Sequence, residues 1–198
     1  VFDSAIEAGA DELLVVIGYE AAQIVDRFGD EFRGTPITYV HQRDQRGLAH
    51  AVLQTEPHVD GPFLVVNGDN VFTESLRPAV TAFECEGVDG TLAVEEVSRE
   101  EARRTGVVET ANGAISGIIE KPDEPPSTLV TTGCYVLPTD VYEACELVQP
   151  SADGEHQLSE AVSLLAHAGY TIETVRVGDR VNVNRPANIE RAERYLRQ

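Results

Sequence analysis

Short apolar runs alternate with segments of helical periodicity along the first half of the chain. The runs predict strands buried on both faces, and the segments between them repeat apolar side chains every three or four residues, as helices do. This alternation is typical of βαβ crossovers, so we expect an α/β fold, with a Rossmann-like, mostly parallel sheet covered by helices on both faces. The expected strands are residues 13–17, 37–40, 63–67 and 90–97, and the expected helices are residues 2–9, 22–28, 48–54 and 76–86.

The pattern changes after Gly106, where strand-like pieces follow one another without helices between them. Asn112-Gly113 is a strong hairpin signal, so an antiparallel hairpin patch is expected beside the parallel sheet. No linker interrupts the chain, and we predict a single domain over residues 1–198. The expected strands are 107–109, 114–120, 129–137, 171–177 and a short one around Val181, and the expected helices are 139–147, 157–168 and 186–196.

Charge narrows the range of partners. The chain has 34 acidic against 15 basic residues, a formal charge of −19, and its single lysine is Lys121. Such a surface repels phosphates of nucleic acids, so no nucleic-acid partner is expected. No apolar run reaches the roughly 20 residues that cross a bilayer, which predicts no membrane partner. We interpret the replacement of lysine by acids as an adaptation to a salt-rich cytoplasm, the alternative being a merely acidic protein.

Cysteine and histidine patterns offer no further chemistry. Cys85, Cys134 and Cys145 are odd in number and lack a C-x-x-C spacing, so they predict reduced core thiols in a cytoplasmic protein. The histidines show no metal-ligand spacing either. We therefore expect neither a disulfide framework nor a zinc site.

The most informative stretch is the apolar run at residues 63–66, which ends in Asn67-Gly68-Asp69-Asn70. Ligands of open α/β sheets bind outside the carboxyl ends of the strands, where a carboxylate can hold a divalent cation against phosphate. Asp69 is therefore a candidate metal ligand. The alternative is that these polar residues form an ordinary turn.

Further stretches fit the same chemistry. Gln42 lies where a strand is expected to end, and its amide offers a donor and an acceptor that match uracil or thymine, while Gly47 would let a base approach the backbone. Lys121, in Glu120-Lys121-Pro122, can meet a phosphate as a point charge. The alternatives are a helix-capping Gln42 and a surface Lys121. Two more stretches stand out, Thr131-Thr132-Gly133-Cys134-Tyr135 and Gly154-Glu155-His156-Gln157-Leu158-Ser159-Glu160.

In this combination and order, the motifs resemble those of the sugar-1-phosphate nucleotidylyltransferases, particularly the glucose-1-phosphate thymidylyl- and uridylyltransferases. The resemblance extends over the whole chain. It implies transfer of a nucleotidyl group from dTTP or UTP to a sugar 1-phosphate such as glucose 1-phosphate, with Mg²⁺ as cofactor and a nucleoside triphosphate and the sugar 1-phosphate as partners. The same resemblance leads us to expect a homo-oligomer.

Roles implied by the resemblance fall on individual positions. The nucleotide base would be recognised by Gln42 and Gly47, and the metal would be bound by Asp69 and Asn182. Asp69 and Lys121 would be the catalytic residues. The sugar phosphate would be held by Gly106, Glu120, Lys121, Thr132 and Gly133.

Two departures from the family pattern leave alternatives open. Asn182 places an amide where many relatives have a second metal-binding aspartate. The glycine-rich loop that opens the family's sequences has no counterpart, so we expect roughly 25–40 preceding residues, with a strand and that loop, and no activity from these 198 residues alone. A regulatory or sugar-nucleotide-binding subunit of the same fold is the alternative function. A flavodoxin-like signalling domain would leave the Glu120-Lys121 motif unexplained.

Overall fold

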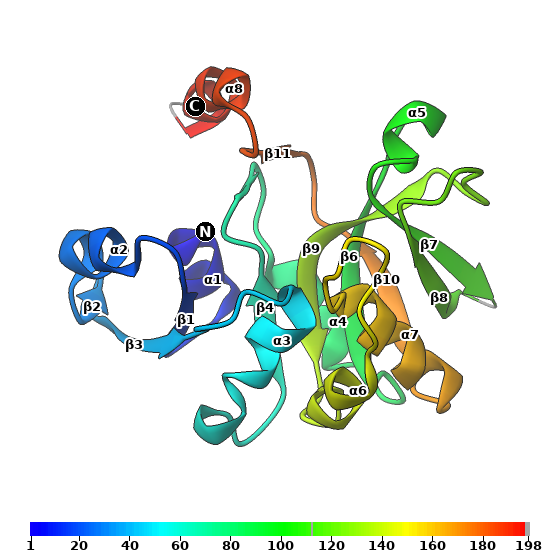
Figure 1. The fold of residues 1–198 in the computed structure, drawn as a ribbon, viewed down its shortest axis with the longest axis horizontal. Coiled ribbons are helices and arrows are strands. Elements are labelled where there is room, and N and C mark those ends of the chain that lie inside the picture. The colour runs from blue at the N-terminus through cyan, green and yellow to red at the C-terminus, as the bar shows by residue number, and fades with distance from the viewer. Residues whose placement is uncertain (112, 197–198) are drawn as a thin grey trace.

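The computed structural model describes residues 1–111 and 113–196 and shows an α/β fold with three sheets (Figure 1). The helices are α1 (Phe2–Ala8), α2 (Ala21–Phe28), α3 (Leu48–Leu53), the 3₁₀ turn Glu56–His58, α4 (Arg77–Phe83), α5 (Arg99–Ala102), α6 (Val141–Leu147), α7 (Leu158–His167) and α8 (Pro186–Leu196). The strands are β1 (Leu13–Ile17), β2 (Glu31–Phe32), β3 (Thr35–His41), β4 (Phe63–Val66), β5 (Asn70–Phe72), β6 (Gly90–Glu96), β7 (Gly106–Ala111), β8 (Ala114–Glu120), β9 (Leu129–Leu137), β10 (Ile172–Arg176) and β11 (Arg180–Asn182).

The main sheet has the order β4-β9-β6-β10-β8-β7, and its pairing is mixed rather than mostly parallel. β6 and β10 pair in parallel, but β9 runs antiparallel to both β4 and β6. Val65 and Leu92 are both partners of Tyr135, so β4 and β6 keep the common direction expected of a crossover while β9 lies between them. The α/β class is confirmed, and the prediction of a largely parallel sheet is corrected by this inserted strand.

The hairpin expected after Gly106 is present, since β7 and β8 pair antiparallel from Gly106↔Glu120 to Ala111↔Ala114. Asn112, half of the turn signal, lies outside the described residues. The register places Gly106 opposite Glu120, which brings two of the predicted sugar-binding residues side by side. This pairing also orients the hairpin so that its open end faces the site described below.

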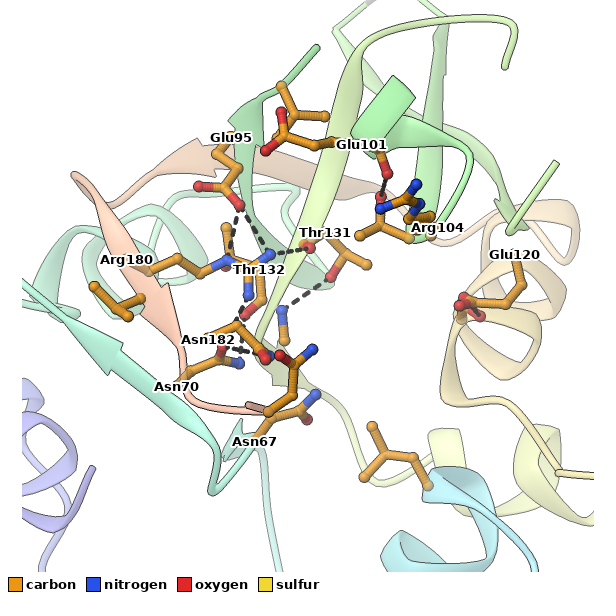
Figure 2. A pocket seen from close by; sticks show the side chains of 18 of the residues that line it. Asn67, Asn70, Glu95, Glu101, Arg104, Glu120, Thr131, Thr132, Arg180 and Asn182 are labelled. Atoms are coloured by element: carbon orange, nitrogen blue, oxygen red, sulfur yellow. Dashed lines mark hydrogen bonds and ion pairs between the residues drawn. The ribbon is translucent and has the colours of Figure 1, made fainter. Parts of the chain in front are cut away.

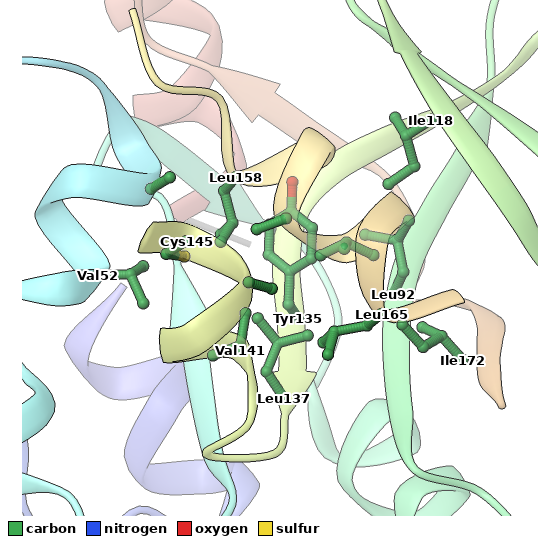
Figure 3. Close-up of a cluster of buried hydrophobic side chains, with 14 of the residues drawn as sticks. Val52, Leu92, Ile118, Tyr135, Leu137, Val141, Cys145, Leu158, Leu165 and Ile172 are labelled. Carbon is green, nitrogen blue, oxygen red and sulfur yellow. The ribbon is translucent and has the colours of Figure 1, made fainter. Parts of the chain in front are cut away.

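Helices cover both faces of the main sheet, as predicted. Along β9, Tyr135 and Leu137 pack in the larger apolar cluster with α3, α6 and α7, shown in Figure 3. Cys134 and Val136 point to the other face and pack in the cluster that contains Leu76 and Ala79 at α4. Each fully buried leucine or valine contributes roughly 1.5–3 kcal/mol, so the two clusters hold the sheet rigid beneath its polar edge.

A smaller sheet of β1, β3 and β2 stands beside the main one and carries α1 and α2. β1 and β3 pair in parallel, and an apolar cluster around Leu13 and Ile37 joins this part to Leu64 of β4. Within the described residues, β1 pairs only with β3 and β4 only with β9. Each of these strands therefore has one edge without a strand partner.

The third sheet is the ribbon of β5 and β11, which the sequence pattern did not predict as a pair. The chain forms strand β5 directly after Asp69. The polar residues 67–69 are therefore a turn between the strands β4 and β5 and not a turn between a strand and a helix. The register places Asn182 opposite Asn70, 112 positions away in the chain. α8 follows this ribbon and packs against β11 (Figure 1).

Two smaller expectations can be compared with the structure. Cys134 and Cys145 are buried free thiols whose burial raises the pKa of each to about 12, but Cys85 is exposed, which corrects its assignment to the core. Among residues 1–111 and 113–196, no helix has the length and apolar character needed to cross a membrane.

Candidate active site

Beside the β5–β11 ribbon, a pocket of about 620 Å³ opens at the polar edge of the main sheet. Figure 2 shows Glu120 facing Arg180 and Asn182 across the open space. The pocket walls come from β7, β8, β9, β11, the start of α7 and the turn after β4. Its lining includes Leu48, Asn67, Asn70, Glu95, Gly106, Glu120, Thr131, Thr132, Gly133, Tyr135, Ser159, Arg180 and Asn182. Five of the predicted site residues are thus brought together, namely Gly106, Glu120, Thr132, Gly133 and Asn182.

Glu120 is the acid of the pocket's hairpin wall. Its Oε2 atom accepts a hydrogen bond from the Ser159 hydroxyl at 3.2 Å. Burial raises the pKa of Glu120 above its ordinary value, and the hydrogen bond from Ser159 offsets part of this shift. A Cβ on Gly106 would lie 3.0 Å from the same carboxylate oxygen, so glycine at this position keeps the space beside the carboxylate open. When ionised, Glu120 is a strong acceptor for hydroxyl groups of a ligand.

A bend in β9 forms the floor of the pocket. Gly133 has φ +74°, and a Cβ there would lie 2.6 Å from Asn67 Nδ2, so this backbone conformation and its close neighbour both require glycine. Thr132 is buried and donates its hydroxyl to the Ala93 carbonyl at 2.9 Å. Thr131 donates to the Tyr135 hydroxyl at 3.0 Å. Burial raises the pKa of Tyr135 to about 12, so this phenol stays protonated at neutral pH.

The two predicted metal ligands lie next to each other. Asn182 Nδ2 donates to Asp69 Oδ2 at 2.9 Å, although the two residues are far apart in the sequence. The Oδ1 atom of Asn182 is buried and accepts no hydrogen bond from any described residue. An unpartnered buried oxygen beside an exposed carboxylate fits a hard cation such as Mg²⁺, which needs one or two protein oxygens and takes the rest from phosphate and water. The described residues contain no cluster of three or more His, Cys, Asp or Glu side chains for a metal.

Lys121 lies beside Glu120 but outside the pocket lining. Its Nζ atom forms an ion pair with Asp153 at 2.8 Å, and the side chains are 47% and 59% exposed. The hydrogen bond that Lys121 donates to Asp153 holds the pKa of Lys121 above its ordinary value, so the ammonium is charged at neutral pH. Exposed pairs of this kind are worth roughly 0–1 kcal/mol, so another anion can replace Asp153. The role of Lys121 with the sugar phosphate stays a prediction.

Gln42 and Gly47 lie together near the pocket but not in its lining. Gln42 Nε2 donates to the Gly47 carbonyl at 3.0 Å and lies 2.9 Å from His50 Nδ1. Gly47 has φ +104°, and a Cβ there would lie 2.7 Å from backbone atoms of His156. Gln42 therefore holds the backbone just before α3, but it does not cap this helix, because α3 has no side-chain cap hydrogen bond. The amide oxygen of Gln42, Oε1, is the atom left to bond a nucleotide base. Recognition of the base by Gln42 therefore stays a prediction.

Sequence reasoning missed several lining residues. Asn67 and Asn70 stand in the motif around Asp69, and Ser159 stands in the stretch after Gly154, so their positions carried a signal that was not used. Glu95 and Arg180 lie in no motif, so the sequence carried no signal for either residue. Their ion pair, with 2.8 Å between Arg180 Nη2 and Glu95 Oε1, forms only because β6 and β11 approach the same edge of the pocket.

The fold and this pocket define a class of α/β protein with a polar ligand site at a sheet edge, and comparison with known proteins names the family. Residues 1–179 match the family described as Nucleotidyl transferase, and the chain belongs to that family. The UTP–glucose-1-phosphate uridylyltransferase AglF of Haloferax volcanii is 44% identical over the whole chain, which covers 82% of AglF. A glucose-1-phosphate thymidylyltransferase of Streptomyces griseus is 32% identical over 90% of the chain, which spans only 53% of that relative.

Solved structures of other proteins have the same fold as this chain. A UDP-glucose pyrophosphorylase complexed with UDP-glucose superimposes with a TM-score of 0.85 at 24% identity, over 98% of this chain and 84% of that one. A putative glucose-1-phosphate thymidylyltransferase from Bacillus anthracis, in complex with a sucrose, gives a TM-score of 0.85 at 25% identity, over 98% and 80% of the two chains. These comparisons confirm the fold class and the resemblance inferred from the motifs.

Proposed function

We propose that the protein transfers a uridylyl group from UTP to glucose 1-phosphate or a close relative of it, releasing pyrophosphate. The observation that carries this proposal is the arrangement of the pocket. An acid that can accept hydrogen bonds from sugar hydroxyls, Glu120, faces Asn182 across the pocket. Asn182 in turn contacts Asp69, which lies outside the pocket lining and is the second residue of the proposed cation-binding pair. The activities for which AglF and the Streptomyces griseus relative are named support a hexose 1-phosphate as acceptor. The preference for UTP over dTTP rests on AglF alone.

In the proposed reaction, a phosphate oxygen of the sugar 1-phosphate attacks the α-phosphorus of UTP, and the bond to the bridging oxygen of the leaving pyrophosphate breaks. Little covalent chemistry is required of the protein, so positioning and charge stabilisation carry the catalysis. Glu120 and the bend at Gly133 would orient the sugar. Lys121 would exchange Asp153 for the attacking phosphate and hold it by charge.

The negative charge on the phosphates also has to be neutralised, and Mg²⁺ can do this. Asp69 and Asn182 would hold the ion, which when bound neutralises charge on the phosphates. The carboxylate of Asp69 supplies the negative charge of this pair, and the amide of Asn182 supplies a neutral oxygen. We place the reaction in the cytoplasm and expect a homo-oligomer, for which the exposed Ile189 and Leu196 on α8 offer apolar contact area.

The strand and glycine-rich loop of the family pattern would complete this site. β1 and β4 each have one edge without a strand partner in the described residues, which supports a further strand between them. A glycine-rich loop after that strand would lie close to Asp69, because Asp69 also follows the end of β4. The catalytic assay therefore requires protein expressed from the complete gene.

A pyrophosphate-release screen tests the proposed function. The protein from the complete gene is incubated with each nucleoside triphosphate and a set of sugar 1-phosphates in molar KCl with Mg²⁺. We expect release with UTP and glucose 1-phosphate to exceed release with ATP or GTP by at least about 100-fold, the discrimination that a misplaced base hydrogen bond typically produces. Binding of UDP-glucose without any release would instead favour the alternative of a regulatory or sugar-nucleotide-binding subunit.

Salt should stabilise the protein. The charge of −19 makes the folded chain repel itself at low ionic strength, and salt screens this repulsion within a Debye length of about 3 Å at 1 M. We expect the melting temperature to rise by roughly 10 °C or more between 0.1 M and 2 M KCl, since about 1 kcal/mol shifts the midpoint of a domain this size by 2–4 °C. Circular dichroism melting measures it, and a midpoint independent of KCl would contradict the proposed adaptation to salt.

A further inference from the structure

Arg180 occupies an unusual place for a cation in so acidic a chain. Its side chain is only 11% exposed, and its partner Glu95 is 24% exposed. Arg180 Nε and Nη2 both donate to Glu95 Oε1, at 2.9 and 2.8 Å. The remaining donor, Nη1, reaches Asn70 Oδ1 at 2.8 Å (Figure 2). Burying this ion pair costs free energy that a surface pair does not, so its position calls for an explanation.

The neighbours of Asn70 determine how its amide is oriented. The guanidinium of Arg180 can only donate, so it must face the oxygen of Asn70. On the other side, Asn70 Nδ2 lies 2.9 Å from the Thr132 carbonyl, which can only accept. Asn70 is 1% exposed, so water cannot substitute for either partner. Rotating the amide by 180° would bring two donors together and two acceptors together.

The orientation of Asn70, together with the carboxylate of Asp69, then sets that of Asn182. Asn182 Nδ2 donates to Asn70 Oδ1 at 3.1 Å and to Asp69 Oδ2 at 2.9 Å, and both of these oxygens can only accept. The Oδ1 atom of Asn182 is consequently turned away from both, and it is one of two buried oxygens of the pocket residues without a described hydrogen-bond partner, the other being Asn67 Oδ1. A chain of polar contacts therefore leads from Glu95 through Arg180 and Asn70 to the free oxygen of Asn182.

We propose that Arg180, held by Glu95, is a positioning residue that orients Asn70 and thereby turns Asn182 Oδ1 toward the bound divalent cation. This inference rests on the proposed function, because it takes Asp69 and Asn182 as the cation-binding pair. It also explains why an amide and not a carboxylate occupies position 182. Without the cation, an aspartate at position 182 would place its carboxylate oxygens against two other acceptors, Asn70 Oδ1 and Asp69 Oδ2. Asn70 cannot turn its NH₂ group toward such an aspartate, because Arg180 holds the Asn70 oxygen on that side.

The chain contains a matched control for this ion pair. Arg176 and Glu96 are joined by the same chemistry at the same 2.8 Å and belong to β10 and β6, but each side chain is 63% exposed. Among the described residues, neither forms a hydrogen bond or ion pair with Asn70, Asp69 or Asn182. Arg176→Met and Glu96→Gln therefore remove a neighbouring Arg–Glu pair without touching the proposed chain of contacts.

Titration with Mn²⁺ alone, followed by electron paramagnetic resonance of the free ion, tests the inference on Arg180→Met and Glu95→Gln. We expect the Mn²⁺ dissociation constant to rise about 10-fold in Arg180→Met and by less in Glu95→Gln, with no change in Arg176→Met or Glu96→Gln. Asp69→Ala serves as the reference for the site and should lose this binding. Thermal melting of each variant shows whether it is folded at the titration temperature.

The outcomes separate two failures. If Asp69→Ala weakens Mn²⁺ binding while folded Arg180→Met binds as the unmodified protein does, the positioning role of Arg180 is wrong and the proposed cation site stands. If Asp69→Ala binds Mn²⁺ unchanged, the cation site of the proposed function is wrong. Should Arg180→Met not fold, Glu95→Ala carries the test, because it removes the carboxylate that holds Arg180 in place beside Asn70; unchanged Mn²⁺ binding in folded Glu95→Ala would overturn the inference.

Discussion

Replacing Asp69 by alanine is expected to lower kcat for pyrophosphate release by at least about 100-fold in the protein expressed from its complete gene. The change removes the carboxylate that accepts the hydrogen bond from the Asn182 amide, and with it the negative charge that would hold Mg²⁺ at the phosphates. A 100-fold loss corresponds to roughly 2.7 kcal/mol of transition-state stabilisation, which is within the several kcal/mol attributed to a catalytic cation. Steady-state kinetics at saturating UTP and sugar 1-phosphate measure it.

The control for this prediction is Asp60→Ala, which removes one exposed negative charge from the loop before β4 and leaves the pocket intact. Its kcat should stay within about twofold of the unmodified value. Mg²⁺ titrations add a second readout, because Asp69→Ala should need a higher Mg²⁺ concentration for half-maximal rate. Undiminished release by Asp69→Ala would remove this carboxylate from the mechanism.

The second large effect is expected at Lys121. Lys121→Ala should raise the KM for the sugar 1-phosphate by about 100-fold, whereas Lys121→Arg, which keeps the charge but not the compact ammonium, should raise it less. The KM for UTP should change little. Initial rates over a range of sugar 1-phosphate concentrations measure these constants, and an unchanged KM in Lys121→Ala would exclude the phosphate-binding role.

Replacing Asp153 should change the KM for the sugar 1-phosphate in the opposite direction. In the described structure Asp153 holds Lys121 and places a negative charge where the dianionic sugar phosphate would have to approach. Asp153→Asn should therefore lower the same KM by a few fold, since it removes both the competition for Lys121 and the repulsion. Asp3→Asn is the matched control, because Asp3 pairs with Arg33 at the same 2.8 Å on the exposed surface of the smaller sheet. A higher KM in Asp153→Asn would indicate that Asp153 helps to place Lys121.

Much of the fold could be predicted because local patterns carry it. The helices at 48–54 and 157–168 and the strands at 13–17 and 114–120 follow from apolar periodicity, and the structure has them within one or two residues. The pairing of strands could not be predicted. Periodicity says which side chains are buried but not which strand lies beside them, and the insertion of β9 between β4 and β6 depends on contacts between distant segments.

Some residues of the candidate site could likewise be predicted from the sequence, and others could not. Gly106 and Glu120 could be associated from the sequence, because a hairpin signal brings its two ends together. Asp69 could be found as a polar residue after a buried strand. Arg180 and Glu95 could not, since a lone arginine near the end of an acidic chain and a glutamate at the end of a strand look like solvated surface residues. Their burial depends on where the β5–β11 ribbon crosses the sheet edge.

By itself, the sequence determined the α/β class, the nucleotidyl transferase family and five of the residues that line the pocket, because motif spacing and periodicity are local properties of the chain. Only the tertiary structure decided how those residues work together. It paired β5 with β11, and that register set Asn182 against Asp69 and Asn70. It also buried Arg180 beside Glu95. Hydrogen-bond donors and acceptors acquire an orientation only from their neighbours in space, so the free oxygen of Asn182 is a property of the folded protein alone.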